Sequence, residues 1–484
     1  MDRQIWIALT FIAFLLFFIV VGICSATQKQ NTTTDYLLAS RNVNPWMTAL
    51  SAMATGQSGF LFIGNVGLAY VAGFSAIWIS VAWAVGDYIA WWLVFKKLRL
   101  VSQETDANTV SSFLGQEHNN QSNHPINKKQ RWVTIISALI TIAFLGCYAA
   151  AQLVAGSKAL TAVFGWNYHL GIIVGAIVVV VYCFSGGIRA SIWTDSVQAI
   201  LMIGSLILLC TIGLIECGGF GGLWTQLNAI DPTLTNWIPS KKTWGFLPYF
   251  LGWLVAGFGV VGQPHIVVRA MAIDSADNLG FARNLKFICG QINSATAFGV
   301  GLIARVVLPE LMTSSDPELA LPYLSLELLP AALVGLMLAG LFSATISTAD
   351  SQILSCSAAL SQDLIPEAKQ SYKMAKIATL TVTAIVLAIA LVGDNNVFSL
   401  VIFSWSVLAS GLGPLLVLRA WQKPVTVPVA IAMMIVGIGA ALTWKLGLNL
   451  SSAIYEVLPG MAAGMAVYLI AQFFPSKKVD NKSG

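Results

Sequence analysis

The sequence of 484 residues has little charge and no grouping of cysteines. Only 10% of the residues are Asp, Glu, Lys or Arg, whereas 57% are hydrophobic. Soluble globular proteins carry roughly 25% charged residues, so this composition excludes an ordinary soluble domain. The seven cysteines show no CxxC or metal-ligand spacing, which argues against a disulfide framework and a zinc site. We expect them to be small packing residues.

Motifs for catalysis are also lacking. No paired acid and base, metal motif or nucleotide motif stands out, so we do not expect an enzyme. No loop is long enough to fold as a separate domain, and residues 475–484 are expected to form a short disordered tail. We therefore expect a single transmembrane domain over residues 1–484, without a fused signalling module.

The chain instead contains long apolar runs. A hydrocarbon core of about 30 Å takes roughly 20 helical residues to cross. We count about thirteen segments that meet this requirement, and we interpret the first as a retained helix and not as a signal peptide. The segments are 4–26, 44–70, 74–98, 132–159, 168–187, 193–216, 244–264, 284–308, 330–357, 372–393, 397–420, 425–446 and 453–474. The expected fold class is all-α, a polytopic membrane protein.

The distribution of Lys and Arg predicts the orientation. With the N-terminus outside, 20 of the 26 Lys and Arg residues lie on the inner side. Six lie on the outer side or at its helix ends, namely Arg3, Lys158, Lys241, Lys242, Arg305 and Lys445. This positive-inside bias predicts an outer N-terminus and a cytoplasmic C-terminus in the cell membrane. The same bias accounts for the net charge of +5, so no nucleic-acid partner is needed.

One apolar run is unusually polar. Residues 339–356, AGLFSATISTADSQILSC, carry six hydroxyls and one carboxylate. Polar groups at membrane depth normally face a bundle interior or a water-filled cavity, so this helix is expected to line a cation path. At about 100° per residue, one face holds Ala344, Ser347, Thr348, Ser351 and Ser355, with Asp350 at its edge.

Two segments contain helix-weakening glycines at corresponding places. The segment 44–70 contains TGQSG, and the segment 244–264 contains GFGVVGQP. Interrupted helices in two halves indicate a transporter site built from inverted repeats, whereas the alternative is that glycines only allow close helix packing. The repeats would be 44–216 and 244–420. The first helix and loop (1–43) and two C-terminal helices (425–474) would lie outside them.

Several motifs appear in the order and at the spacing of a known family. They are DYLLASR at 35–41, TALSA at 48–52, YAAAQLVAG at 148–156, SGG at 185–187, WTDSVQA at 193–199, GQPHIV at 262–267, SATISTADSQIL at 343–354 and YEVLPG at 455–460. Through them the chain resembles the sodium:solute symporter family over nearly its whole length, most closely the bacterial sodium/proline symporter branch. The resemblance implies a five-plus-five inverted repeat like that of the leucine transporter, with extra helices at both ends.

The resemblance also implies a set of Na+ ligands. Carbonyl oxygens at the break in the second helix and in the ninth helix, with two hydroxyls of the ninth, would hold the coupling ion. A hard monovalent cation needs several oxygens, and unwound backbone supplies them without burying charge. The alternative is that the two hydroxyls bond back to their own helix. The matching positions are Ala54, Gln57 and Ala344 for carbonyls, and Ser347 and Thr348 for hydroxyls.

Asp195 matches a family acid on the cytoplasmic side of the Na+ site. A buried carboxylate needs a cation or donor partner, and a structural partner such as Arg189 is the alternative to ion passage. The proline branch has an acid where this chain has Gly56, and Asp350 is a candidate replacement for that charge; otherwise it is a hydrogen-bonding or protonatable acid. The candidate second cation position or ion exit is then lined by Asp195, Ser347, Asp350 and Ser351.

The solute pocket departs from the proline branch. Tyr148 is retained, while other aromatic positions become Phe60, Ala256 and Val260, so the pocket gains volume and proline itself is doubtful. Trp253 is expected to replace some of the lost aromatic surface, and packing is the alternative. The full candidate set is Thr55, Gly56, Ser58, Phe60, Tyr148, Trp253, Ala256, Val260 and Gln263.

The sequence thus predicts a Na+-coupled symporter that imports a small polar organic solute, amino-acid-like or carboxylate, by alternating access. Its partners would be the solute, Na+ and the lipid bilayer, and we expect it to work as a monomer. Two alternatives remain open: a proton-coupled carrier on the same scaffold, with Asp350 or Asp195 titrating, and a transporter-like solute sensor.

Overall fold

The structure, a computed structural model, describes residues 3–25, 27, 30, 32–116, 128–239, 242–314, 316–365, 371–393 and 396–473. The expected disordered tail at 475–484 lies outside these residues. Within them the protein is helical, and the β-type pairing is one isolated bridge between Val43 and Ile273. The all-α prediction is confirmed.

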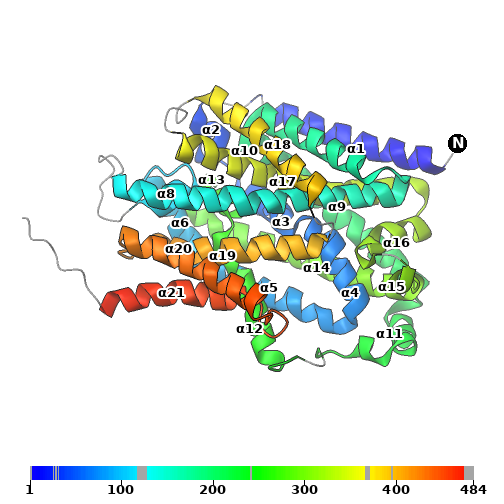
Figure 1. The fold of residues 1–484 in the computed structure, drawn as a ribbon. Coiled ribbons are helices and arrows are strands. Elements are labelled where there is room, and N and C mark those ends of the chain that lie inside the picture. Colours follow the sequence, from blue (N-terminus) through cyan, green and yellow to red (C-terminus); the bar gives the residue numbers. More distant parts are fainter. Residues whose placement is uncertain are drawn as a thin grey trace, which may run out of the picture.

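The longer helices form the bundle of Figure 1. They are α1 (Arg3–Ser25), α3 (Pro45–Gly59), α5 (Ile77–Ala90), α8 (Lys128–Ile140), α9 (Gly146–Phe164), α10 (Tyr168–Glu216), α11 (Gly219–Ile230), α12 (Phe246–Phe258), α14 (Leu279–Val307), α17 (Ala331–Ala358), α18 (Tyr372–Val392), α19 (Val397–Ala420), α20 (Val427–Leu442) and α21 (Val457–Phe473). The shorter ones are α2 (Thr33–Leu38), α4 (Val66–Ala72), α6 (Lys96–Glu104), α7 (Val110–Gly115), α13 (Pro264–Ala272), α15 (Leu311–Ser314) and α16 (Ala320–Leu328).

Nine helical stretches of the described chain are long and apolar enough to cross a membrane, and a bent pair, Phe246–Gly262 with Pro264–Ala272, adds a tenth. The stretch Pro45–Glu104 is one of the nine, although its helical geometry is interrupted at Gly73, where φ is 62°. Gly187, at φ 60°, likewise interrupts α10, and Tyr36 packs so closely there that a β-carbon would not fit. The figure of thirteen crossings stays a prediction.

Burial separates inner helices from outer ones. In the most apolar window of α17 and of α19, 78% of the residues are buried, against 22% in α1 and 28% in α20 with its extension to Gly447. α17 packs against α1, α3, α9, α10, α13 and α18. Figure 1 shows α1 on one side of the bundle and α20 and α21 on the other. The polar helix predicted from the sequence therefore lies at the centre, where side chains from several helices meet.

Two helices break inside the bundle. α3 begins with Asn44 as its cap and Pro45 in its first turn, and it ends at Gly59, followed by the π-helical segment η3 (Phe60–Asn65). α12 continues through the 3-10 segment η8 (Gly259–Gly262), and Gln263 then leaves helical geometry before α13 begins, with a bend of 58°. Both breaks fall in the segments where glycines predicted them.

Candidate functional site

The break in α3 is held by tight contacts. Ser58 adopts φ 53° and ψ −177°, which few residues other than glycine tolerate. The Gly59 amide donates to Gln152 Oε1 of α9 at 2.8 Å. A β-carbon at Gly59 would lie 2.8 Å from Thr345 Cγ2 and 2.9 Å from Ala155 Cβ. Glycine is therefore required at this position, because α9 and α17 both approach the open turn.

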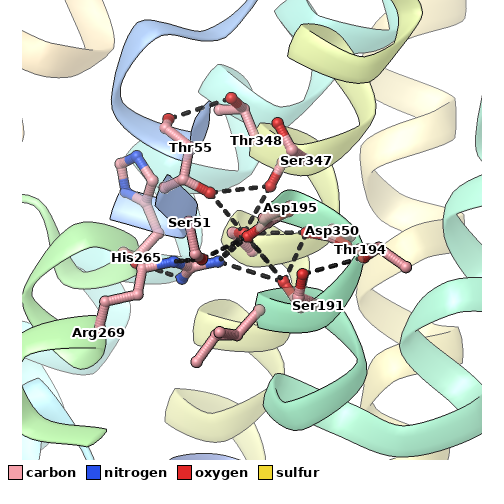
Figure 2. A network of polar contacts seen from close by, with 12 residues as sticks. Ser51, Thr55, Ser191, Thr194, Asp195, His265, Arg269, Ser347, Thr348 and Asp350 are labelled. Atoms are coloured by element: carbon pink, nitrogen blue, oxygen red, sulfur yellow. Dashed lines mark hydrogen bonds and ion pairs between the residues drawn. The ribbon is translucent and has the colours of Figure 1, made fainter. Parts of the chain in front are cut away.

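Hydroxyl groups join α3 to α17 just before the break. Thr55 Oγ1 donates to the Ser347 carbonyl at 3.0 Å and lies 2.8 Å from Ser351 Oγ. Thr348 Oγ1 donates to the Thr55 carbonyl at 3.1 Å. All four side chains are buried, and Figure 2 shows Thr55 and Thr348 facing each other across the two helices. Main-chain and hydroxyl oxygens of both helices therefore meet away from solvent.

The chemistry of this contact fits a Na+ ion. Ser347 Oγ and Thr348 Oγ1 both donate to the Ala344 carbonyl, at 3.2 Å and 3.0 Å. These are the bonds back to the helix that the alternative interpretation describes, and the same oxygens could turn to a cation. Ala54 and Ala344 are fully buried beside them. The donors are uncharged oxygens, which suit a hard monovalent cation.

Gln57 lies apart from the hydroxyl contact. Its carbonyl accepts the Phe60 amide. Its side chain points to α14, where Nε2 donates to the Gly290 carbonyl at 2.7 Å and to Ser294 Oγ at 3.2 Å. Asn293 Nδ2 donates to Gln57 Oε1 at 2.6 Å. The side chain of this candidate carbonyl ligand therefore fastens the broken end of α3 to α14.

A charged cluster lies beside the hydroxyl contact. Arg269 of α13 pairs with Asp195 of α10, Nη2 to Oδ2, at 3.0 Å, and both side chains are fully buried. Ser51 Oγ of α3 donates to the same Asp195 oxygen at 2.6 Å, and Arg269 Nε donates to Ser51 Oγ at 3.1 Å. Figure 2 shows Arg269 reaching between α3 and α10. The other Asp195 oxygen, Oδ1, is buried without a hydrogen-bond partner in the described part of the chain.

Asp350 completes the cluster from α17. Its Oδ1 accepts the hydroxyls of Ser191 at 3.0 Å and Ser351 at 2.9 Å. Arg269 Nη2 also donates to Ser351 Oγ and, at 3.2 Å, to Ser191 Oγ. The structure thus brings Asp195, Asp350 and Ser351 together, as expected, but it adds a guanidinium. Asp195 pairs with this fixed positive charge directly, and Asp350 is linked to it through the hydroxyls of Ser191 and Ser351.

The suggested pairing of Asp195 with Arg189 is wrong. Arg189 Nη2 donates to Asp35 Oδ1 at 2.6 Å and to the Ala39 carbonyl at 3.0 Å. The partner that sequence reasoning missed is Arg269, which was counted only as one of the inner-side positive charges. A lone Arg inside the apolar stretch after the Pro264 break was the available signal, because a buried cation needs an acid.

Next to the break in α3 lies a cavity that is open to solvent. Three of the candidate solute residues line it, namely Gly56, Phe60 and Tyr148. Aromatic side chains that the sequence reasoning missed, Trp83 of α5 and Trp405 of α19, also line it, with ring centroids 4.6 Å apart. Helices other than the two broken ones therefore add aromatic surface to that of Phe60.

The other candidate solute residues lie around this cavity and do not line it. Trp253 stacks on Tyr455 with centroids 4.4 Å apart, and the Ala256 carbonyl accepts Trp405 Nε1 at 2.9 Å. Gln263 Nε2 donates to the Trp405 carbonyl at 3.1 Å, and Val260 is buried. Ser58 Oγ lies 3.3 Å from Tyr148 Oη, and Thr55 faces α17. These residues support the wall of the cavity from behind.

The cavity also contains an ion pair that was not predicted. Lys286 Nζ of α14 contacts Asp87 Oδ2 of α5, and their side chains are only 11% and 14% exposed. Both residues line the cavity.

Among the described residues, no group of three or more His, Cys, Asp or Glu could hold a metal ion.

Comparison with known proteins agrees with this geometry. The profile of the family described as "Sodium:solute symporter family" matches residues 36–437. A high-affinity proline transporter of Bacillus subtilis (strain 168) is 30% identical over 460 residues, 93% of this chain and 94% of the relative. A sodium/proline symporter of Escherichia coli (strain K12) is 30% identical over 495 residues, 98% of this chain and 94% of the relative.

Solved structures share the fold. A substrate-bound, outward-open Na+-coupled sialic acid symporter superposes with a TM-score of 0.79 at 18% identity, covering 98% of this chain and 99% of that one. Mhp1, a nucleobase-cation-symport-1 family transporter, gives a TM-score of 0.57 at 16% identity, covering 91% and 96%. The expected leucine-transporter-like fold is confirmed, and the relatives are transporters, not enzymes. The chain is a multi-pass Na+-coupled symporter of the cell membrane, and it belongs to the sodium:solute symporter family.

Proposed function

We propose that this symporter imports a small amino-acid-like solute together with Na+, which binds between the broken end of α3 and the polar face of α17. The observation that carries the proposal is the buried meeting of Thr55 with Ser347 and Thr348, where uncharged oxygens of two helices converge. The ligands would be the carbonyls of Ala54, Gln57 and Ala344 and the hydroxyls of Ser347 and Thr348. When bound, Na+ would bring a positive charge into a site whose oxygen ligands are all uncharged.

Coupling then follows from the arrangement of α3. An ion that fixes the end of α3 against α17 also positions Gly56 and Phe60, which line the cavity on the other side of the same helix. Na+ and the solute each raise the affinity of the protein for the other, because both bind to the same ordered end of α3. In the proposed alternating access, Asp195 lies on the exit route of the ion, and its Oδ1, which has no hydrogen-bond partner among the described residues, supports that role.

The solute is proposed from the cavity and the relatives. Two curated relatives at 30% identity are named for proline, which makes proline the first solute to test. The cavity, with Trp83 and Trp405 in its wall, offers aromatic surface to a larger apolar side chain as well. We therefore propose an amino acid, with proline as the reference and a bulkier side chain preferred.

The membrane arrangement is part of the proposal. The N-terminus lies outside and the C-terminus in the cytoplasm, and the two repeats are residues 44–216 and 244–420, with 1–43 and 425–474 outside them. The breaks at Ser58 and Gln263 support this division, because each lies in the first helix of one proposed repeat. Lipid covers the exposed apolar residues of helices such as α1, and one copy is sufficient for transport.

The test is uptake into vesicles that contain the purified protein. An inward Na+ gradient should drive accumulation of labelled L-proline, L-leucine or L-phenylalanine, and collapsing the gradient should release it. Uptake that does not depend on Na+ but is driven by a pH gradient would indicate proton coupling instead of Na+ coupling. Binding of the solute without any net flux would instead indicate a sensor.

Proton coupling is the second candidate, and one observation favours it. In a fully buried cluster, Asp195 pairs with the guanidinium of Arg269, and Asp350 is linked to the same guanidinium through the hydroxyls of Ser191 and Ser351. A second positive charge, a proton or a cation, would balance the pair, because an uncompensated buried charge is costly. Asp350→Asn would abolish uptake driven by a pH gradient alone if this candidate is right.

A further inference from the structure

The ion pair of Asp87 and Lys286 stands in the wall of the cavity and belongs to neither the Na+ contact nor the Arg269 cluster. The pair joins α5 to α14 with both side chains largely buried. The Lys286 Nζ also lies 5.2 Å from the centre of the Trp91 ring. Charged groups on membrane-spanning helices are costly, and they generally mark a path or site for a substrate or ion.

The pair lies one helical turn from the aromatic end of the cavity. Asp87 follows Trp83 by four residues on α5, which is about 6 Å along a helix axis. Trp83 packs against Phe60 and Trp405, with ring centroids 6.1 Å and 4.6 Å apart. A ligand that fills the cavity would therefore have an apolar part between aromatic rings and an ionic part at the pair.

On α14, the pair lies one turn from the groups that hold α3. Gly290 follows Lys286 by four residues, and its carbonyl accepts the side chain of Gln57. Lys286, Gly290 and Gln57 all line the cavity. A ligand that engages Lys286 would therefore touch the same stretch of α14 that fastens the broken end of α3.

Charge balance selects the class of ligand. A solute that separates the pair must give each partner a new counter-ion, because an unpaired charge on a largely buried side chain is unfavourable. A simple carboxylate would satisfy Lys286 and leave Asp87 alone, and a simple amine would do the reverse. A solute that carries both an ammonium and a carboxylate satisfies both.

We propose that Asp87 and Lys286 form the ionic subsite of the solute cavity and select a zwitterion, with the ammonium bound by Asp87 and the carboxylate by Lys286. This inference rests on the proposed function and names the charge class of its solute. Binding of the solute would exchange this internal ion pair for two new ones.

The first test is selectivity in vesicles with an inward Na+ gradient. Labelled L-proline, L-leucine and L-phenylalanine are taken up in competition with their carboxylate-only counterparts, cyclopentanecarboxylate, isocaproate and hydrocinnamate, and their amine-only counterparts, pyrrolidine, isoamylamine and phenethylamine. The native protein should prefer each amino acid over both counterparts by about tenfold or more. Equal competition by either counterpart would overturn the proposal.

Single neutral variants should change that preference in opposite directions. Asp87→Asn leaves the cation of Lys286 to be matched, so competition by the carboxylates should rise about tenfold relative to the amino acids. Lys286→Met should raise competition by the amines in the same way. Unchanged selectivity in folded, membrane-inserted variants would overturn the proposal.

Two double variants separate a binding subsite from a structural link between helices. Asp87→Lys with Lys286→Asp restores an ion pair but reverses its direction, so a link should recover and a subsite should not. Asp87→Asn with Lys286→Met removes both charges and should retain the fold, yet lose the preference for zwitterions. Full recovery of amino-acid uptake by the reversed pair would overturn the proposal. The matched control is Lys96→Met at the exposed Lys96–Asp277 pair, which should behave like the native protein.

A binding measurement distinguishes this inference from the proposed function. In saturating Na+, L-leucine or L-phenylalanine should raise the thermal stability of the purified native protein, and the doubly neutral variant should show no such shift. A shift in the native protein without any Na+-driven uptake would reject the proposed transport and retain the subsite. A shift that persists in the doubly neutral variant would overturn the subsite even where transport is normal.

Discussion

Two polar regions that α17 shares with α3 and α10 differ in their electric charge. In one, Thr55, Ser347 and Thr348 contribute only hydroxyls and carbonyls, and the guanidinium of Arg269 is linked to them only through Ser351. In the other, a few residues away, Asp195 and Asp350 lie with Arg269. The neutral region carries no charge of its own, which is why we propose it as the site that binds and releases the mobile cation. The charged region holds a permanent cation on α13 and ties α3, α10, α13 and α17 together.

This comparison predicts its largest effect at Arg269. Arg269→Ala would leave two buried carboxylates without their fixed counter-charge, which should lower the free energy of unfolding by about 3–5 kcal/mol. Thermal unfolding of the purified protein, together with uptake, measures the effect. Arg269→Lys is the control, and it should recover part of the stability. A fully stable Arg269→Ala protein would show that the cluster does not hold the helices together.

The next effect should appear in the neutral region. Ser347→Ala with Thr348→Ala removes two of the five proposed Na+ ligands, so the Na+ concentration for half-maximal uptake should rise at least tenfold, about 1.4 kcal/mol. The control is Ser343→Ala with Ser357→Ala, since both of these buried hydroxyls donate back to α17, at 2.7 Å and 2.6 Å. Unaltered Na+ dependence in the first variant would discard the ligand assignment.

The two carboxylates of the charged region should also differ. Asp195 holds Arg269 and Ser51, so Asp195→Asn should lower Na+-driven uptake by about tenfold. The carboxylate of Asp350 accepts the hydroxyls of Ser191 and Ser351, which are weaker partners than a guanidinium, so Asp350→Asn should keep uptake within about twofold. Initial rates at equal protein content measure both. The reverse order would place the functional acid on α17.

A smaller effect is expected where α3 is fastened to α14. Gln57→Ala removes its bonds to Gly290 and Asn293 but keeps the main-chain carbonyl, so the Na+ half-saturation should rise by about threefold. Combining Gln57→Ala with Asn293→Ala should add little, since both act through one contact. Strictly additive losses would show that the two side chains work independently.

The smallest effect is expected at the surface. Lys96 pairs with Asp277 at 2.8 Å, but the two side chains are 54% and 85% exposed. Exposed pairs contribute little because water and salt screen them. Lys96→Ala should therefore leave unfolding and uptake unchanged, and a clear loss of either would mean that this pair belongs to a larger contact.

The sequence anticipated the bundle and its two breaks well, for a physical reason. Apolar runs of membrane-spanning length and clustered glycines act locally, so Gly59 and the residues before Pro264 could be interpreted without a fold. The hydroxyl face of α17 was equally readable, because the helical period alone places Ser347, Thr348 and Ser351 together. These expectations depend on neighbours within a few positions in the chain.

The partners of the charged groups were not readable in the same way. Asp195 meets Arg269 across 74 positions, and Asp87 meets Lys286 across 199. The pattern around Asp195 does not select its partner, since Arg189 lies six positions away in the same helix, whereas Arg269 belongs to α13. The aromatic wall formed by Trp83 and Trp405 was missed for the same reason.

By itself, the sequence determined that the chain is helical and membrane-spanning, where α3 and α12 are interrupted, and which face of α17 is polar, because spacing along one helix decides each of these. Only the tertiary structure decided which charges neutralise one another and which side chains surround the cavity. Those outcomes depend on how helices distant in the chain pack, and a buried charge is satisfied by whichever partner that packing brings within a few ångströms.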